Sequence, residues 1–387
     1  MIVNNNIAFK TYSDSRTGFW RFNCATSLYS CETLACGKAQ LAHFPGWFNA
    51  SRIGFITDAQ LASQAWVKTL MGADNGQLFI LSTPVDAEAL QSTLVQLSYD
   101  KIDMIIAIGG GTVLDAAKLL ATALAQNCEI QQLPQLTRAP DRPIPLIAIP
   151  TTFGTGSETN MISHLQTGDA KIGLRQPWLA PTIALLIAEI ALHTPWELRY
   201  LGGVDAWLHA LEAATLQYEY SPLQGSLLQQ SLLLHHASFA QFLDQPDSHT
   251  ASDLVTAATL SGIGLNNGRT GLIHALAGPY AQVTELPHAL SLLPFIGVAL
   301  DALVNTLEQR SQLPQLTAVS MKNHFEQTIA LHIPRFKQQL SKQFSETDIK
   351  QLADQCLKDS VAIRESPLEI SHAVCCQLYQ KAFDALQ

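Results

Sequence analysis

Charged residues are scarce in this sequence. They make up 14% of its 387 residues, whereas apolar residues make up 47%, so a large buried core is expected and disorder is not. Lysine and arginine form no evident patch and the formal net charge is −9, which argues against nucleic acid or an anionic membrane as a partner. No apolar run reaches the roughly 18 residues that a membrane span needs.

Two further features are missing. The seven cysteines include no CxxC pair, and they resemble the free thiols of a reducing compartment. The first residues, MIVNNNIAFKTYSDSR, lack the basic and then apolar segments of a signal peptide. We therefore expect a cytoplasmic protein.

The sequence changes character near Pro195. Short apolar runs rich in Ile, Leu and Phe precede it, at residues 52–58, 77–81, 103–111, 145–152 and 183–188. Helix-length stretches separate the first three runs, a pattern typical of a parallel sheet covered on both faces, whose ligands bind beyond the carboxyl ends of the strands. After Pro195, long Leu- and Ala-rich segments predict helices. We infer an α/β domain at residues 1–193 and an all-α domain at residues 194–387.

The motif GGGTVLDAAK follows the third apolar run. It is neither a GxGxxG fingerprint nor a Walker loop. Gly109, Gly110 and Gly111 would expose bare backbone at the start of a helix, which suits a pyrophosphate. The alternative is a tight strand-to-helix turn, with Thr112 as N-cap and Asp115 completing a capping box.

Two other strand ends carry polar side chains. The motif PTTFGTGSE, with Thr151, Thr152 and Ser157, can offer hydroxyl and amide groups to a phosphate or ribose, although a polar turn is the commoner explanation. Asp58 ends the first apolar run, where a carboxylate can accept hydrogen bonds from a ribose 2′-OH and repel a 2′-phosphate. The alternative role for Asp58 is to cap a helix over residues 59–68.

A possible metal site lies in the second half. Asp205 and His209 are four residues apart in an expected helix and so share one face. His274 and His288 follow in other segments. One carboxylate and three imidazoles suit Fe²⁺, Zn²⁺ or another divalent ion. The alternative is that each is an ordinary core or surface residue, since the chain has twelve histidines.

Four ordered motifs resemble those of the iron-containing (group III) alcohol dehydrogenases, over about residues 50–295. GGGTVLDAAK is similar to the GGGSxxDxAK of that family, and PTTFGTGSE matches its PTTxGTGSE. GGVDAWLHALEA resembles DAxxHAxE, and GLIHALAG with LPHA resembles GxxHxxAH with PHG. Lys171 also stands where the family carries a lysine upstream of the ligand aspartate.

The resemblance implies a dehydroquinate synthase-like fold, in which an α/β dinucleotide-binding domain precedes a helical metal-binding domain. It assigns Asp205, His209, His274 and His288 as metal ligands that act in catalysis through the metal. It places NAD, or less favourably NADP, against Asp58, Gly109, Gly110, Gly111, Thr112, Asp115, Thr151, Thr152, Ser157 and Lys171. The implied reaction is hydride transfer between NAD(P) and an alcohol or its aldehyde or ketone, in a homodimer.

The sequence departs from the family pattern beside one ligand. Gly278 stands four residues after His274, where the family has a histidine, and Arg269 stands five before it, where a small residue is usual. We expect a roomier substrate site, and an anionic substrate if Arg269 faces it. Ala289 replaces the glycine of PHG. The alternatives are a sugar-phosphate cyclase or lyase, a glycerol dehydrogenase-like enzyme, or a binder without turnover.

Overall fold

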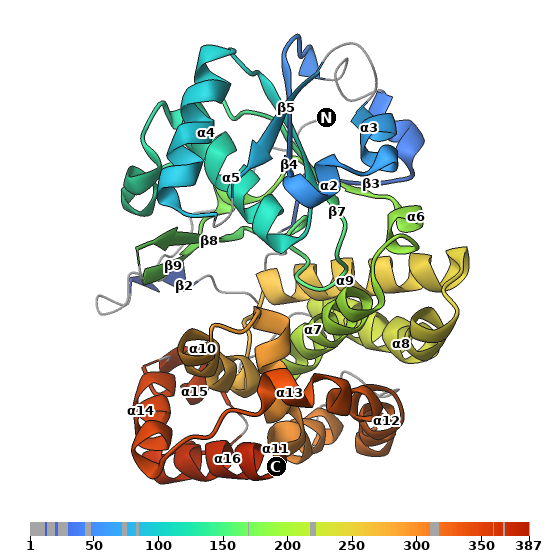
Figure 1. Ribbon diagram of the computed structural model, residues 1–387, viewed down its shortest axis with the longest axis vertical. Coiled ribbons are helices and arrows are strands. Elements are labelled where there is room, and N and C mark those ends of the chain that lie inside the picture. Colours follow the sequence, from blue (N-terminus) through green and yellow to red (C-terminus); the bar gives the residue numbers. More distant parts are fainter. Residues whose placement is uncertain are drawn as a thin grey trace.

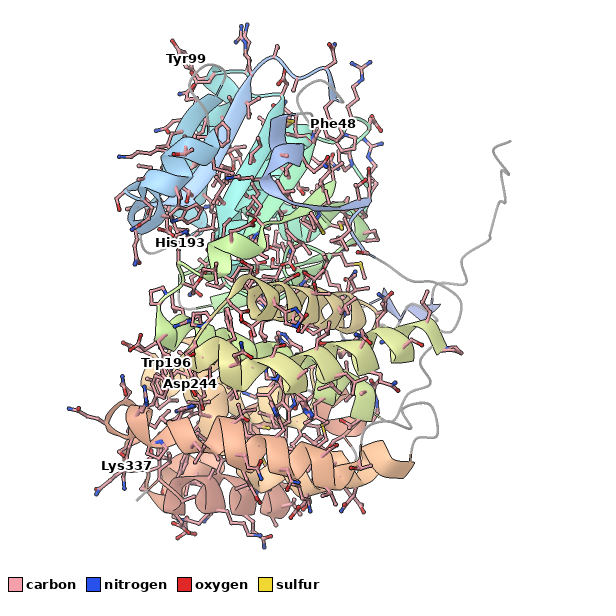
Figure 2. All side chains as sticks on the ribbon, turned by 90° about the vertical axis from the view of Figure 1, so that its right-hand side faces the viewer. Phe48, Tyr99, His193, Trp196, Asp244 and Lys337 are labelled. Carbon is pink, nitrogen blue, oxygen red and sulfur yellow. The ribbon has the colours of Figure 1, made fainter. Side chains whose placement is uncertain are left out.

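An α/β part and a helical part follow each other along the chain (Figure 1). The computed structural model describes most of the sequence, namely residues 12–13, 20–21, 30–42, 48–71, 76–82, 85–168, 170–216, 222–309, 317–358, 360–366 and 368–386. In Figure 2, His193 lies near the last part of the α/β region and Trp196 lies within the first helix of the helical region.

Six parallel strands form the central sheet, in the order β3-β10-β7-β6-β4-β5. They span Thr33–Cys36 (β3), Ile53–Asp58 (β4), Gly76–Leu81 (β5), Met104–Gly109 (β6), Leu146–Pro150 (β7) and Ile183–Leu186 (β10). All five predicted strands are confirmed. The interior strands β6, β7 and β10 are buried throughout, which is why their sequences do not alternate.

Helices cover both faces of the sheet (Figure 1). They span Ala59–Ala62 (α2), Ala65–Met71 (α3), Ala87–Tyr99 (α4), Gly111–Gln126 (α5) and Ala188–Ala191 (α6). On one face, Ile105 and Ala107 of β6 pack with Ala117 of α5. On the other, Ile106 and Ile108 belong to a core that continues into the helical part.

Two short strand pairs and several short helical turns complete this part. The antiparallel pairs are Tyr12–Ser13 (β1) with Trp20–Arg21 (β2), and Ile162–Thr167 (β8) with Ala170–Arg175 (β9). The 3₁₀ turns are Lys38–Ala42 (η1), Ile130–Gln135 (η2) and Pro177–Leu179 (η3). The sequence interpretation missed β3, β8 and β9, because each is short or mixes apolar with polar residues.

The second half is helical, as predicted. Its helices are Trp196–Thr215 (α7), Pro222–Asp244 (α8), Ser248–Asn266 (α9), Leu272–Thr284 (α10), His288–Gln309 (α11), Ala318–His324 (α12), Lys337–Leu340 (α13), Glu346–Cys356 (α14), Ser360–Arg364 (α15) and His372–Asp384 (α16). A π turn, Phe325–Ile329 (η4), and a 3₁₀ turn, Ala330–Phe336 (η5), link α12 to α13. Helix α7 packs against α8, α9 and α11, and its Gly202 lies against the loop after β7, so it connects the two parts.

Helix α11 is unusually apolar. Over His288–Thr306 it is long and apolar enough to cross a membrane, with a mean hydropathy of 1.6. We expected no apolar segment as long as a membrane span, and by length and composition this helix is such a segment. Within the protein, 61% of that window is buried, and α11 packs against α7, α10 and α16, which is the pattern of a core helix.

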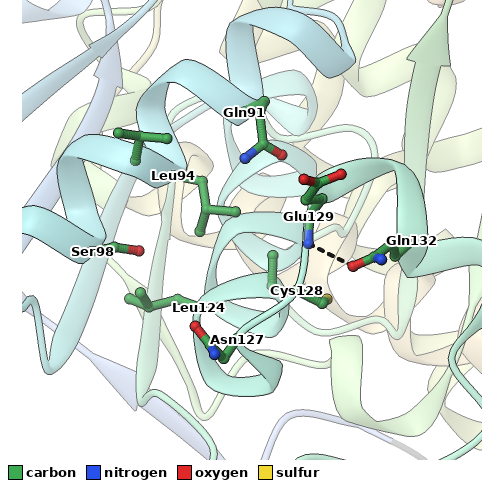
Figure 3. Close-up of a pocket in the computed structure, with 10 residues that line it drawn as sticks. Gln91, Leu94, Ser98, Leu124, Asn127, Cys128, Glu129 and Gln132 are labelled. Atoms are coloured by element: carbon green, nitrogen blue, oxygen red, sulfur yellow. Dashed lines mark hydrogen bonds between the residues drawn. The ribbon is translucent and has the colours of Figure 1, made fainter.

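A pocket of 460 Å³ opens between α4, α5 and η2 (Figure 3). Leu94 and Asn127 line it, and the backbone N–H of Glu129 donates to the Gln132 side chain at 2.9 Å beside it. It lies at the carboxyl end of α5, about 24 Å along the helix from the glycines at its start. The pocket is therefore separate from the cofactor-binding edge that the sequence predicts.

Candidate metal centre and cofactor edge

The four predicted metal ligands come together in the structure. Asp205 and His209 lie on α7, His274 lies in the first turn of α10, and His288 begins α11. Oδ1 of Asp205 is 3.5 Å from Nε2 of His209, 3.5 Å from Nε2 of His274 and 3.7 Å from Nε2 of His288. Among the residues that the structure describes, this is the one group whose ligand atoms converge, all within 4.8 Å of one another.

These separations fit a divalent cation. Tetrahedral coordination with bonds of ~2.1 Å places neighbouring ligand atoms about 3.4 Å apart. Oδ1 of Asp205 and Nε2 of His274 are buried and have no hydrogen-bond partner within the protein. Unpaired buried polar atoms are costly, so a group that binds both of them suits the site.

The site opens toward solvent on one side. The side chains of Asp205, His209 and His274 are 3%, 6% and 7% exposed, whereas that of His288 is 45% exposed. A substrate would therefore reach the cluster from the His288 side.

The charged groups around Asp205 and His274 favour a negative Asp205 and a positive His274, whereas His209 is shifted the other way. Burial opposes ionisation of Asp205, but the neighbouring imidazoles outweigh it and hold the pKa of this carboxyl well below its usual range. Burial also opposes protonation of His274, yet the carboxylates of Glu212 and Asp205 raise its pKa to about 9. For His209, burial dominates and lowers the pKa of the ring.

Two of the imidazoles are oriented by hydrogen bonds at Nδ1, the ring nitrogen that faces away from the cluster. Nδ1 of His209 lies 3.3 Å from the carbonyl oxygen of Gly154, and Nδ1 of His274 lies 2.5 Å from Oε2 of Glu212. Both partners accept hydrogen bonds, so each ring donates from Nδ1 and directs Nε2 into the cluster. Sequence reasoning assigned Glu212 no role; its spacing from His209 on the same face of α7 was the available signal.

The glycine motif forms the turn from β6 to α5. Gly110 is the N-cap of α5 and no side chain caps it. The alternative in which Thr112 and Asp115 cap the helix is therefore wrong, because the N-cap is Gly110, two residues earlier, and the helix begins at Gly111. Thr112 is exposed in the first turn, and the first N–H groups of α5 have no side-chain partner there.

Close contacts explain two of the glycines. A Cβ on Gly109 would lie 2.4 Å from Cβ of Val113, and one on Gly110 would lie 2.9 Å from Oγ1 of Thr152. The turn can therefore approach the loop after β7 only with glycine. Such a bare backbone surface beside a helix start suits a phosphate group.

A buried polar network ties α5 to the PTTFGTGSE loop. The Ser157 hydroxyl donates to Asp115 at 2.6 Å and accepts from the buried Lys118 at 2.7 Å. Lys118 also donates to Asn160 at 2.9 Å, and Nδ1 of His164 lies 3.0 Å from Oδ2 of Asp115. Burial lowers the pKa of Lys118, although Asp115 opposes that shift. The network links the GGGTVLDAAK and PTTFGTGSE motifs, and Ser157 is part of it.

Asp58 lies at the carboxyl end of β4, beside the end of β6. Its Oδ1 accepts from the backbone N–H of Leu61 at 2.8 Å. It thus caps a helix, which is the shorter α2 rather than one continuous helix over residues 59–68. Lys171 pairs opposite Gln166 in β9; its side chain lies outside the described residues.

The loop after β7, which carries the PTTFGTGSE motif, lies beside the cluster of predicted metal ligands. A Cβ on Gly154, in the loop after β7, would lie 2.9 Å from the Gly202 backbone and 3.3 Å from Oδ2 of Asp205. The carbonyl of the same Gly154 faces His209. The loop of the PTTFGTGSE motif therefore contacts His209 directly and leaves no room for a side chain at Gly154 beside Asp205.

The two unusual residues lie on either side of the start of α10. Arg269 is half-buried in the turn that precedes the helix. Gly278 is exposed on α10, one turn after His274, and a Cβ there would meet open space. Among the described residues, none comes within 4 Å of the place that a Cβ would take at this position, where the family has a histidine.

Other histidines lie apart from the ligand cluster. His235 is buried, His236 is half-buried, and the side chain of His249 is 82% exposed. His193 stacks on Trp66. The cysteines that the structure describes are free, as predicted, and Cys24 lies outside the described residues.

Comparisons with known proteins follow the same division of the chain. The family described as iron-containing alcohol dehydrogenase matches residues 31–188, and the C-terminal region of the Fe-containing alcohol dehydrogenase family matches residues 200–383. An alcohol dehydrogenase of Thermococcus barophilus is 25% identical over 76% of this chain and 81% of its own. A sulfoacetaldehyde reductase of Bilophila wadsworthia is 31% identical over 49% of this chain and 50% of its own.

A solved structure shares the whole fold. Sulfoacetaldehyde reductase from Bifidobacterium kashiwanohense, in complex with NAD⁺, superposes with a TM-score of 0.77 at 18% identity, covering 92% of this chain and 98% of that one. The two family matches together cover most of the sequence. The chain therefore belongs to the iron-containing alcohol dehydrogenase family.

Proposed function

We propose that this protein is a metal-dependent oxidoreductase that interconverts an alcohol and its aldehyde or ketone with NAD. The observation that carries the proposal is the position of Gly154, whose carbonyl oxygen lies 3.3 Å from Nδ1 of His209 and where an added Cβ would lie 3.3 Å from Oδ2 of Asp205. It joins a nucleotide motif to a converging ligand set, so a hydride donor and an activated substrate oxygen would meet there.

One set of residues would bind the metal ion and another would bind the nicotinamide cofactor. Asp205, His209, His274 and His288 would hold a divalent cation, Fe²⁺ or Zn²⁺, which supplies a Lewis acid for the substrate oxygen. The glycine turn and the loop after β7 would bind and orient the nicotinamide cofactor, which carries the hydride. The predicted cofactor-binding residues support this arrangement, since the ends of β4, β6 and β7 meet at one edge of the sheet.

We also propose a cofactor preference, a cellular location, an oligomeric state and a domain boundary. Asp58 would favour NAD over NADP by repelling a 2′-phosphate with the carboxylate oxygen that does not cap α2. We also propose a cytoplasmic homodimer, with the domain boundary between residues 193 and 194.

The test is a chelator-sensitive assay. Purified protein loaded with Fe²⁺ or Zn²⁺ should form NADH from simple alcohols and consume it with aldehydes. Activity should vanish on chelation and return with metal. Turnover that persists without metal would refute the proposal, and a product formed without net NADH change would favour a cyclase or lyase.

We propose, in addition, that the substrate is larger than a short alkanol and anionic. The open space at Gly278 supports the size, and the charge of Arg269 in the turn before ligand His274 supports a carboxylate or sulfonate. A relative that is 31% identical over half of each chain is a sulfoacetaldehyde reductase, whose named substrate is anionic.

A substrate panel tests this second part. Neutral and carboxylated or sulfonated alcohols and aldehydes are compared on wild type and Arg269→Ala. A selective loss on the anionic members is expected. Faster turnover of ethanol or propanol than of every anionic substrate, unchanged by the substitution, would contradict it.

A further inference from the structure

Glu212 is a buried carboxylate beside the ligand cluster but is not one of the converging ligands. It lies on the same face of α7 as Asp205 and His209, and its exposed fraction is 0%. Burial of a carboxylate is costly unless hydrogen bonds compensate it. Glu212 accepts three: from Nδ1 of His274 at 2.5 Å, from the Gly271 N–H at 2.8 Å and from the Ile273 N–H at 2.5 Å.

We propose that Glu212 is a positioning residue that fixes His274 as a metal ligand; the inference rests on the proposed metal centre. A carboxylate only accepts hydrogen bonds, so Nδ1 of His274 carries a proton. Nε2 is then the nitrogen left to bind a cation. It is buried without a partner, 3.5 Å from Oδ1 of Asp205. Carboxylates that orient metal-bound histidines in this way raise metal affinity.

Glutamine cannot replace this group, although it has the same size. The three donors approach both carboxylate oxygens, with two at Oε2 and one at Oε1. A glutamine side chain has one oxygen, so its amide N–H₂ must face at least one backbone N–H or His274. Either the start of α10 loses a hydrogen bond, or His274 accepts at Nδ1 and directs a proton toward the cation.

Gly271 provides a second, independent way to disturb Glu212. A Cβ at this position would lie 3.1 Å from Oε1 of Glu212. Gly271→Ala would thus push the carboxylate aside by a few tenths of an ångström while keeping its charge. Glu197→Gln is the matched control, because Glu197 is exposed in the first turn of the same helix.

The experiment measures Co²⁺ binding to metal-free protein by competition with a chromophoric chelator, for wild type and the three variants. The visible d–d spectrum and the unfolding midpoint of the metal-free protein are recorded alongside. Glu212→Gln should raise the Kd for Co²⁺ about tenfold to a hundredfold and alter the d–d bands. Gly271→Ala should give a smaller rise, and Glu197→Gln should change neither.

A role limited to capping α10 predicts a different result. The unfolding midpoint of Glu212→Gln would fall while its Kd and d–d spectrum stay those of wild type, and this would overturn the inference. If Glu212→Gln does not fold, an unchanged Kd in Gly271→Ala overturns it instead. Failure of wild type to bind Co²⁺ removes both the metal centre and the inference, whereas normal wild-type binding with unaltered variants removes only the inference.

Discussion

Two groups of three histidines lie on opposite sides of α7. One group is His209, His274 and His288, and the other is His235, His236 and His324. Asp205 and His209 lie about half a helical turn away from Gly203 and Trp207, which the second group contacts. The two groups therefore offer a comparison of histidines within one protein core.

The second group uses its ring nitrogens within the protein. Nδ1 of His235 lies 3.0 Å from Nε2 of His324, and Nε2 of His235 lies 2.9 Å from the Gly203 carbonyl oxygen. Trp207 donates from Nε1 to Nε2 of His236 at 3.2 Å. In the first group, by contrast, the buried Nε2 of His274 has no hydrogen-bond partner and faces Oδ1 of Asp205 at 3.5 Å, and the ligand atoms of all three histidines converge on that oxygen. Burial alone does not identify a metal ligand, whereas convergence of ligand atoms does.

The largest expected effect is the loss of a ligand from the first group. His288→Ala should lower metal affinity by more than the ~100-fold that outer partners contribute and abolish activity with it. The fold should survive, since His288 is the exposed member. Metal content per chain, measured by atomic emission, checks this, with exposed His249→Ala as the control. Near-stoichiometric metal in purified His288→Ala would show that the assignment is wrong.

Removal of a member of the second group should affect stability instead. His235→Ala leaves the Gly203 carbonyl and His324 without their partner and opens a cavity, at a cost of roughly 3 kcal/mol in the free energy of unfolding. The metal content per folded chain should equal that of wild type. Denaturant unfolding and metal analysis together check this, and a parallel loss of metal at unchanged stability would remove the distinction between the groups.

The second group should also make the protein sensitive to acid. Burial lowers the pKa of His236 to about 4 and holds the pKa values of His235 and His324 below the usual 6.5. The unfolded chain therefore binds protons below pH 6.5 that the folded chain does not, so stability is lost as the pH falls from 6.5 toward 4. His236 alone should contribute roughly 2 kcal/mol of that loss by pH 5.

His236→Gln tests this pH dependence, because glutamine keeps an acceptor for Trp207 without titrating. The free energy of unfolding of this variant should fall less steeply between pH 6.5 and 5 than that of wild type. Parallel curves for the two proteins would contradict the account.

The smallest expected effect concerns cofactor choice. Asp58→Gly should narrow the preference for NAD a few fold, mainly through the KM for NADP, because the repulsion of a 2′-phosphate is removed. Stability should change by only a few tenths of a kcal/mol, since glycine is tolerated at an N-cap. Steady-state kinetics with both cofactors check this; a wild-type preference for NADP would leave Asp58 as a helix cap alone.

The sequence predicted the interior of the sheet and the helical second half well, because buried strands and long Leu- and Ala-rich helices carry strong local signals. Edge strand β3 has only four residues and is largely exposed, so it gave none. The alternative N-cap of α5, Thr112, was misplaced by two residues because the N-cap is Gly110, which has no side chain to mark a cap.

The ligand set was predicted from the resemblance of ordered motifs rather than from spacing. Asp205 and His209 share a helix face by spacing alone, but His274 and His288 lie on other helices, whose packing no local pattern encodes. The same limit hid the contact of Gly154 with His209 and the bond of Glu212 to His274. Both join elements that are distant along the chain.

The central claim is that Asp205, His209, His274 and His288 hold a cation beside the bound nicotinamide cofactor. Anomalous X-ray diffraction on both sides of the zinc absorption edge, from crystals grown with Zn²⁺ and NAD⁺, tests it most directly. We predict one strong anomalous peak about 2.0–2.2 Å from the four ligand atoms, with the nicotinamide next to it. A stoichiometric zinc peak at other residues, or nicotinamide density remote from these four, would contradict it.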